Sequence, residues 1–198
     1  PEDFAPALLQ WYGEHARILP WRDDPQPYRV WVSEIMLQQT RVEAVKPYFQ
    51  RFMEALPDLE SLAQAEEQML LKLWEGLGYY NRVRNLQKAA QQALSEYGGL
   101  PSTAEELIRL PGIGPYTAGA VASIAFGRPE PAVDGNVLRV ITRLMAYDGD
   151  ISKDSVKKEV AKALIPSVVL DPAAFNQAVM ELGATVCLPN GAPKCEAC

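Results

Sequence analysis

Apolar residues recur at helical spacing along most of this chain, while strict alternation of apolar and polar residues is nearly absent. The first pattern is typical of amphipathic helices and the second of half-buried strands. The sequence therefore predicts an all-α protein. The expected helices cover residues 4–18, 28–39, 42–53, 59–63, 66–74, 81–97, 103–110, 116–126, 136–145, 152–164 and 172–185.

A segment rich in proline and glycine, Pro111-Gly112-Ile113-Gly114-Pro115, separates two of these helices. We expect a tight turn in which Gly112 and Gly114 take positive φ and let the backbone approach a ligand closely. Pro115 suits the first turn of the next helix, where a missing N–H costs nothing. Such a turn directs backbone N–H groups and the positive end of a helix dipole at one point, which a phosphate fits. A dinucleotide-binding turn is excluded because no strand precedes it.

The composition is that of an ordinary globular protein, with 198 residues, 48% hydrophobic and 22% charged. This length allows one domain or two small ones. The net charge of −6 argues against a nucleic-acid partner held by a broad basic surface, although backbone N–H groups bind phosphate without adding charge. No apolar run approaches the roughly 20 residues that span a bilayer, and no signal peptide opens the chain. We therefore expect a cytoplasmic protein without a membrane partner.

Two carboxylates stand in contrasting surroundings. Glu34 lies among apolar residues of a predicted helix. Burial raises the pKa of a carboxylic acid, so Glu34 is a candidate general acid, the alternative being an exposed glutamate on a helix face. Asp134 precedes another predicted helix, where the alternative is an N-cap. Cleavage of an N-glycosidic bond uses such a pair, because one group protonates the leaving base and the other stabilises positive charge on the sugar.

Several segments occur in the order and approximate spacing found in adenine DNA glycosylases of the MutY type, which are related to endonuclease III. They are residues 19–22 (LPWR), 31–42 (WVSEIMLQQTRV), 74–82 (WEGLGYYNR), 110–120 (LPGIGPYTAGA), 134–137 (DGNV) and 175–178 (FNQA). The chain resembles this family over nearly its whole length. The resemblance implies a base-excision repair enzyme that flips out adenine mispaired with 8-oxoguanine or guanine and hydrolyses its N-glycosidic bond.

The family fold implies a six-helix barrel beside a second helical domain that holds a [4Fe-4S] cluster. On this resemblance we expect the barrel over residues 24–130, with the helix-hairpin-helix at 103–126. Residues 1–23 plus 131–198 would form the helical iron–sulfur domain. The expected partner is double-stranded DNA containing a mispaired adenine, bound by a monomer in the bacterial cytoplasm and associated with the nucleoid when on DNA. We expect this chain to lack the domain that reads 8-oxoguanine in full-length members.

Catalytic roles follow from the same resemblance. Glu34 corresponds to the acid that protonates N7 of adenine, Asp134 to the carboxylate that stabilises the oxocarbenium-like sugar, and Asn136 to the amide beside it. Tyr116 stands where bifunctional relatives carry a Schiff-base lysine. A phenol cannot form that imine, so the resemblance implies base removal without a lyase step.

The resemblance also implies DNA and adenine contacts. Gln39 and Tyr79 correspond to residues that wedge into the duplex and replace the stacking lost when adenine is extruded. For Tyr79 the alternative is a core aromatic residue. Further DNA contacts are expected at Thr40, Leu77, Arg82, Gly112 and Gly114, and the adenine pocket at Trp21, Arg22 and Gln177.

All three cysteines, Cys187, Cys195 and Cys198, lie close together at the end of the chain. In a cytosolic protein this clustering indicates a metal site rather than a disulfide. The resemblance makes them ligands of a [4Fe-4S] cluster. The first gap is one residue longer than is common in the family, and the fourth cysteine ligand is not present, so we expect a truncated cluster loop. A three-cysteine zinc site and thiols without a metal are the alternatives.

Two other functions compete with this interpretation. The first is an endonuclease III-like glycosylase and AP lyase acting on oxidised pyrimidines, against which Tyr116 argues. The second is a DNA-binding module that uses the helix-hairpin-helix without catalysis. The occurrence of Glu34 and Asp134 together in matching contexts argues against the module.

Overall fold

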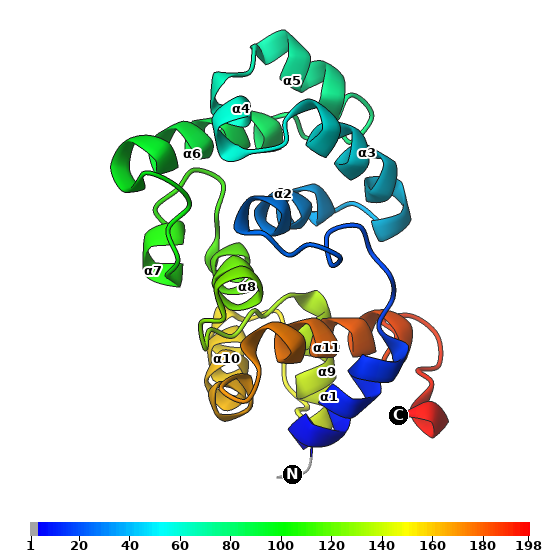
Figure 1. Cartoon of the computed structure of the whole chain (residues 1–198). Helices are drawn as coiled ribbons and strands as arrows, with labels where there is room; N and C mark the ends of the chain where they lie inside the picture. The colour runs from blue at the N-terminus through cyan, green and yellow to red at the C-terminus, as the bar shows by residue number, and fades with distance from the viewer. Residues whose placement is uncertain (1–3) are drawn as a thin grey trace. The chain divides into compact units, whose positions relative to one another are not determined.

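The computed structural model describes residues 4–198, and within that range it contains helices and no strands (Figure 1). The all-α prediction is therefore confirmed. The helices are α1 Phe4–His15, α2 Pro27–Leu37, α3 Val42–Ala55, α4 Leu59–Gln64, α5 Glu67–Trp74, α6 Asn81–Tyr97, α7 Ala104–Leu107, α8 Pro115–Phe126, α9 Gly135–Leu144, α10 Asp154–Val168 and α11 Pro172–Thr185, with a short 3-10 turn, η1, at Cys195–Ala197. No helix of the described residues is long and apolar enough to cross a membrane.

Several helix ends differ from the sequence-based expectation, and two of these differences have a clear structural cause. The helix expected at 4–18 ends at His15, and the backbone N–H of Arg17 donates instead to the Glu181 carboxylate, at 3.1 Å. The helix expected at 152–164 continues through Pro166 to Val168. Val168 is fully buried, so its burial favours the extra turn despite the backbone hydrogen bond that a proline removes.

The chain divides into two compact units. Unit 2 is Ile18–Val121, and unit 1 contains the described residues up to Arg17 together with Ala122–Cys198. The sequence analysis placed these divisions later, before residue 24 and after residue 130. The first difference has a packing cause, because Trp21 is buried in unit 2 with its ring edge-on to Phe49, 5.5 Å between centroids.

Helix α2 of unit 2 is buried at eight of its eleven positions. It packs against α3 and α6, while α4 and α5 pack against α6 and α3 also contacts α5. A helix that is buried around most of its circumference needs apolar residues on nearly every face. The buried positions of α2 are Tyr28, Val30, Trp31, Val32, Ser33, Glu34, Ile35 and Met36. Glu34 is the only carboxylate among these eight positions, which makes its surroundings informative.

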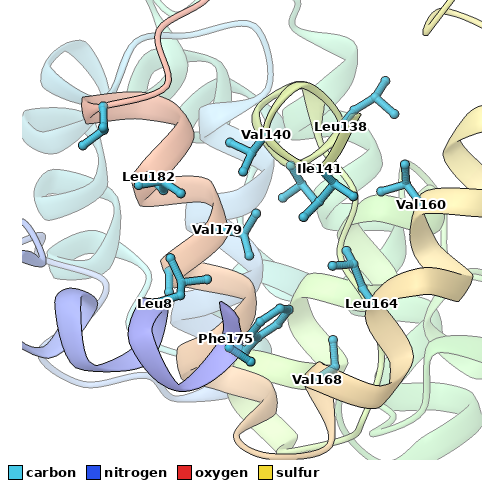
Figure 2. Close-up of a cluster of buried hydrophobic side chains, with 14 of the residues drawn as sticks. Leu8, Leu138, Val140, Ile141, Val160, Leu164, Val168, Phe175, Val179 and Leu182 are labelled. Carbon is cyan, nitrogen blue, oxygen red and sulfur yellow. The ribbon is translucent and has the colours of Figure 1, made fainter. Parts of the chain in front are cut away.

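Helix α11 organises the core of unit 1, where it packs against α1, α9 and α10. Figure 2 shows Phe175 and Val179 of α11 pointing toward Ile141 of α9, Leu164 of α10 and Leu8 of α1. The ring of Phe4 meets Phe175 edge-on, with 6.4 Å between centroids. Close packing of these aliphatic and aromatic side chains fixes the position of α11. Groups on its other faces can therefore hold neighbouring loops in place by hydrogen bonds.

Candidate active site

Glu34 is buried in the middle of α2, with 7% of its surface exposed. The hydroxyl of Tyr116 donates a hydrogen bond to Glu34 Oε2 at 2.6 Å. Tyr116 lies in the first turn of α8, so the helix after the proline–glycine turn supplies the partner of the buried acid. The alternative of an exposed glutamate on a helix face is therefore wrong.

A second side-chain contact joins the same two helices. Gln38 Nε2 donates to Thr117 Oγ1 at 3.4 Å, and Thr117 is 2% exposed. Gln38 is the C-cap of α2 and follows Glu34 by about one turn, and both side chains contact the start of α8. The first turn of α8 is thus held on α2 at two successive residues, Tyr116 and Thr117.

The turn before α8 uses its two glycines differently. Gly112 has φ +78°, and a Cβ there would meet Asn85 Cβ at 3.0 Å, so only glycine suits the position. Gly114 does not take positive φ, and the expectation for its backbone was wrong. It is exposed, and a Cβ would meet nothing within 4 Å. Because α8 begins at Pro115, the N–H groups of its first turn have no acceptor within the helix, as a phosphate site requires.

Asp134 caps α9. Its Oδ1 accepts the backbone N–H of Val137 at 2.7 Å, and its Oδ2 accepts Asn136 Nδ2 at 2.8 Å. Asp134 is therefore the N-cap of α9, and this structural role is compatible with a chemical one. Both hydrogen bonds fix the orientation of the carboxylate, and the helix N-terminus favours a negative charge there.

Arg139 holds Asn136 in turn. One guanidinium nitrogen, Nη2, donates to Asn136 Oδ1 at 2.9 Å and to the carbonyl of Gly183 at 2.8 Å. Its Nε donates to the carbonyl of Cys187 at 2.9 Å. Asp134, Asn136 and Arg139 therefore form one hydrogen-bonded chain that is attached to the backbone of α11 and of the segment after it.

Asn176, for which the sequence predicted no role, is a buried residue that positions a loop. It is 1% exposed; its Oδ1 accepts the N–H of Ala132 at 3.0 Å, and its Nδ2 donates to the carbonyl of Glu130 at 2.8 Å. These bonds fasten the loop that leads into Asp134 to α11. The sequence does indicate this role indirectly. Asn176 lies among apolar residues of a predicted helix, and a buried polar side chain needs hydrogen-bond partners.

The two expected wedge residues, Gln39 and Tyr79, both have positive φ, 57° and 49°. Tyr79 is 67% exposed, so the alternative of a core aromatic residue is wrong. Leu77 is buried at 8% exposure. Arg82 directs its terminal nitrogens at backbone carbonyls of both loops and at the hydroxyl of Thr40. Contact of these residues with DNA stays a prediction.

The expected adenine-pocket residues are distributed over both units. Trp21 and Arg22 belong to unit 2, where Trp21 is buried and Arg22 is half-buried. Gln177 belongs to unit 1, and its Nε2 donates to the carbonyl of Ala173 at 3.1 Å. Their roles in base recognition stay predictions.

The cysteine segment offers the right kind of donor for iron, but not an assembled site. Cys195 and Cys198 are exposed and Cys187 is half-buried, with its Sγ accepting a hydrogen bond from Arg143 Nη1 at 3.2 Å. Among residues 4–198, no three cysteine, histidine or acidic side chains converge on one point as metal ligands would. The segment supplies three of the four thiolates that a [4Fe-4S] cluster takes, and within the described residues these thiols are not gathered at one point.

The helical fold is that of a known class of DNA repair proteins. The chain belongs to the HhH-GPD superfamily of base excision DNA repair proteins, whose family model matches residues 32–166. It is 47% identical over 208 residues to the adenine DNA glycosylase of Mus musculus, covering 98% of this chain and 40% of that protein. With the adenine DNA glycosylase of Schizosaccharomyces pombe it shares 44% identity over 221 residues, covering 100% of this chain and 47% of that protein.

A bacterial relative, the adenine DNA glycosylase of Buchnera aphidicola subsp. Baizongia pistaciae, is 39% identical over 199 residues, covering 98% of this chain and 56% of that protein. The chain thus spans only 40% to 56% of the length of these three relatives.

Solved structures of the superfamily have the same fold. A thermostable thymine-DNA glycosylase superimposes with a TM-score of 0.89 at 29% identity, covering 100% of this chain and 91% of that one. A trapped covalent intermediate of endonuclease III with DNA gives a TM-score of 0.79 at 25% identity, covering 98% of this chain and 89% of that one. The expected endonuclease III-like fold is therefore confirmed, whereas its iron–sulfur part stays a prediction.

Gly183 permits the close approach of α9 and α11 beside Asn136. A Cβ at Gly183 would lie 2.6 Å from Asn136 Cβ and 3.1 Å from its Cα. We expect Gly183→Ala to lower the free energy of unfolding by about 1–3 kcal/mol, because backbone must move to relieve the clash. Gly13→Ala is the matched control, since Gly13 lies in α1 of the same unit with nothing within 4 Å of its Cβ. Urea unfolding measures both, and equal effects would contradict the account.

Proposed function

We propose that this chain carries the catalytic part of a base-excision DNA glycosylase that extrudes adenine mispaired with 8-oxoguanine or guanine and hydrolyses its N-glycosidic bond. The observation that carries the proposal is the buried Glu34 carboxyl hydrogen-bonded by Tyr116 at 2.6 Å. A buried carboxyl with a defined partner in an apolar helix is a costly arrangement for stability alone. The adenine DNA glycosylases that share 39% to 47% identity with the chain support adenine as the substrate.

The chemistry divides between two carboxyl groups. Glu34 gives its proton to N7 of adenine, so the protonated base takes the electron pair of the breaking bond to C1′ and leaves as neutral adenine. Asp134 is the anion that stabilises the positive charge developing on the sugar. Water then adds its oxygen to C1′ and loses a proton. The cap and the Asn136 amide, which bond to both oxygens of Asp134, support this role by fixing the carboxylate.

Duplex DNA is the proposed partner. The glycine turn before α8, the exposed Tyr79 and the exposed Gln39 are features that suit phosphate and base-stack contacts. Solved endonuclease III complexes with DNA, at TM-scores of 0.79 and 0.80, support the same partner. The net charge of −6 favours contacts through backbone N–H groups over a broad basic surface. Monomeric binding and a cytoplasmic location stay predictions.

Replacing the proposed acid should separate chemistry from binding. We expect Glu34→Gln to slow single-turnover release of adenine by about a hundredfold to ten-thousandfold, the usual contribution of general acid catalysis, while the affinity for a duplex with adenine opposite 8-oxoguanine is kept. Glu54→Gln is the matched control, because Glu54 is exposed on α3 of the same unit. Release by the Glu34 variant at the parent rate would remove Glu34 from the mechanism.

The lyase alternative has its own test. Borohydride reduces an imine between protein and DNA to a stable covalent adduct, so a glycosylase-lyase is trapped in high yield. We expect no adduct from the parent protein or from Tyr116→Phe, and slower base release from the variant because Glu34 loses its hydrogen-bond donor. High-yield trapping of the parent would favour the lyase. Duplex binding without base release by the parent would instead favour a non-catalytic DNA-binding module.

An iron–sulfur cluster at the cysteine segment is a separate proposal. The thiol donors and their short spacing support it, and none of the chemistry assigned above depends on it. We expect iron and acid-labile sulfide in equal amounts in protein purified without oxygen, and loss of both in Cys187→Ser. Zinc in place of iron would favour the three-cysteine zinc alternative, and protein without either metal would favour thiols that bind none.

A further inference from the structure

Two loops of unit 2 share an unusual backbone conformation. Gln39, just after α2, has φ +57°, and Tyr79, just before α6, has φ +49°. In the described residues, only Ala146 among other non-glycine residues has positive φ. The left-handed region crowds Cβ against the following carbonyl oxygen, so glycine is the usual residue there. The first loop ends a helix at a position where glycine is common, and yet it carries glutamine.

Burial does not explain these two residues. Tyr79 is 67% exposed and Gln39 is also exposed, so neither side chain gains packing that would offset its strained backbone. Strain of this kind persists only where the surroundings impose it, and it is concentrated at functional sites.

Arg82 connects the two loops. Its Nη1 donates to the carbonyls of Ile35, Met36 and Gln38 at 3.1, 3.1 and 2.6 Å. Its Nη2 donates to the carbonyls of Leu77 and Gly78 at 3.0 and 3.2 Å. Ile35 and Met36 lie in the last turn of α2 and Gln38 is its C-cap, so these bonds meet the C-terminal end of the helix, where the dipole favours a cation.

The contacts of Arg82 require the shape of an arginine. A planar fork with two terminal nitrogens reaches both loops at once, while the ammonium of lysine is a single point with three donors. The guanidinium carbon also lies 5.4 Å from the ring centroid of Trp74 and 5.7 Å from that of Tyr79. Trp74 Nε1 donates to the carbonyl of Gly78 at 3.1 Å, which fixes the second loop further.

We propose that Arg82 is a positioning residue that locks Gln39 and Tyr79 in their left-handed conformations and so presents them as a preformed wedge for the base stack. This role rests on the proposed function, and it differs from the direct DNA contact that the resemblance implies for Arg82. Preorganisation removes the cost of ordering two exposed side chains each time a duplex is opened. Without the lock, both loops relax toward ordinary φ values and extrusion of the base becomes less favourable.

The central experiment compares Arg82→Lys with Arg84→Lys, in the full chain. Arg84 lies on α6 as well, but it is exposed and pairs with Glu67 at 2.9 Å. We expect Arg82→Lys to slow single-turnover adenine release by about tenfold to a hundredfold per active site, with a smaller change in the duplex dissociation constant. Arg84→Lys should match the parent. Active-site titration corrects for misfolded protein, so an unchanged rate per active site would reduce Arg82 to a structural residue and overturn the proposal.

A fluorescence measurement follows extrusion without chemistry. In the Glu34→Gln background, a duplex with 2-aminopurine in place of the target adenine brightens when the base leaves the stack. We expect the Arg82→Lys, Glu34→Gln protein to lose most of this increase at saturating protein concentration. Equal fluorescence with and without the Arg82 substitution would overturn the proposal. Failure of the parent to release adenine would contradict the proposed function instead, and the two failures are therefore distinguishable.

Glycine substitutions test the strain. We expect Gln39→Gly and Tyr79→Gly to leave Tm unchanged or raised, because glycine adopts the left-handed region freely, and to slow adenine release because the wedge is lost. When either glycine substitution is combined with Arg82→Lys, the loss of rate should be smaller than the product of the two single losses, because all three substitutions disrupt the same wedge. A lowered Tm in both glycine variants, or rate losses that multiply fully, would contradict the proposal that Arg82 holds Gln39 and Tyr79 in strained conformations.

Discussion

The structure depends on keeping one carboxyl group inside an apolar helix. Glu34 lies in α2, whose other buried positions are almost all hydrophobic, and a carboxyl there is tolerated only with a hydrogen-bond partner. Tyr116 provides that partner from the first turn of α8. The glycine turn that suits a phosphate directly precedes Tyr116, so it also determines the position of the residue that hydrogen-bonds Glu34. The proposed DNA contact and the placement of the acid therefore depend on the same local backbone.

The second carboxylate illustrates that a structural role and a chemical role are compatible. Asp134 caps α9 through one oxygen and receives the Asn136 amide on the other, and Arg139 fixes that amide. Asn176 fastens the preceding loop from the buried face of α11. In the proposed reaction a fixed anion is more effective than a mobile one, because its orientation requires no reorganisation when charge develops on the sugar.

Local patterns predicted the helices and the surroundings of Glu34 well, because periodicity and turn residues report on chain segments of ten or twenty residues. They could not predict the contacts of Arg82 with carbonyls of α2, which join residues 44 to 47 positions apart. The close approach of Gly183 to Asn136 likewise has no local signal. The left-handed φ of Gln39 also escaped prediction, because glutamine gives no indication of it. These features arise only from tertiary packing.

In the proposed reaction the buried Glu34 acts by protonating N7 of the extruded adenine. The most direct measurement is single-turnover base release from a duplex in which 7-deazaadenine, which has carbon in place of N7, stands opposite 8-oxoguanine, beside the same duplex with adenine. We expect the protein to bind both duplexes and to release only adenine. Release of 7-deazaadenine at the rate of adenine would contradict this role of Glu34.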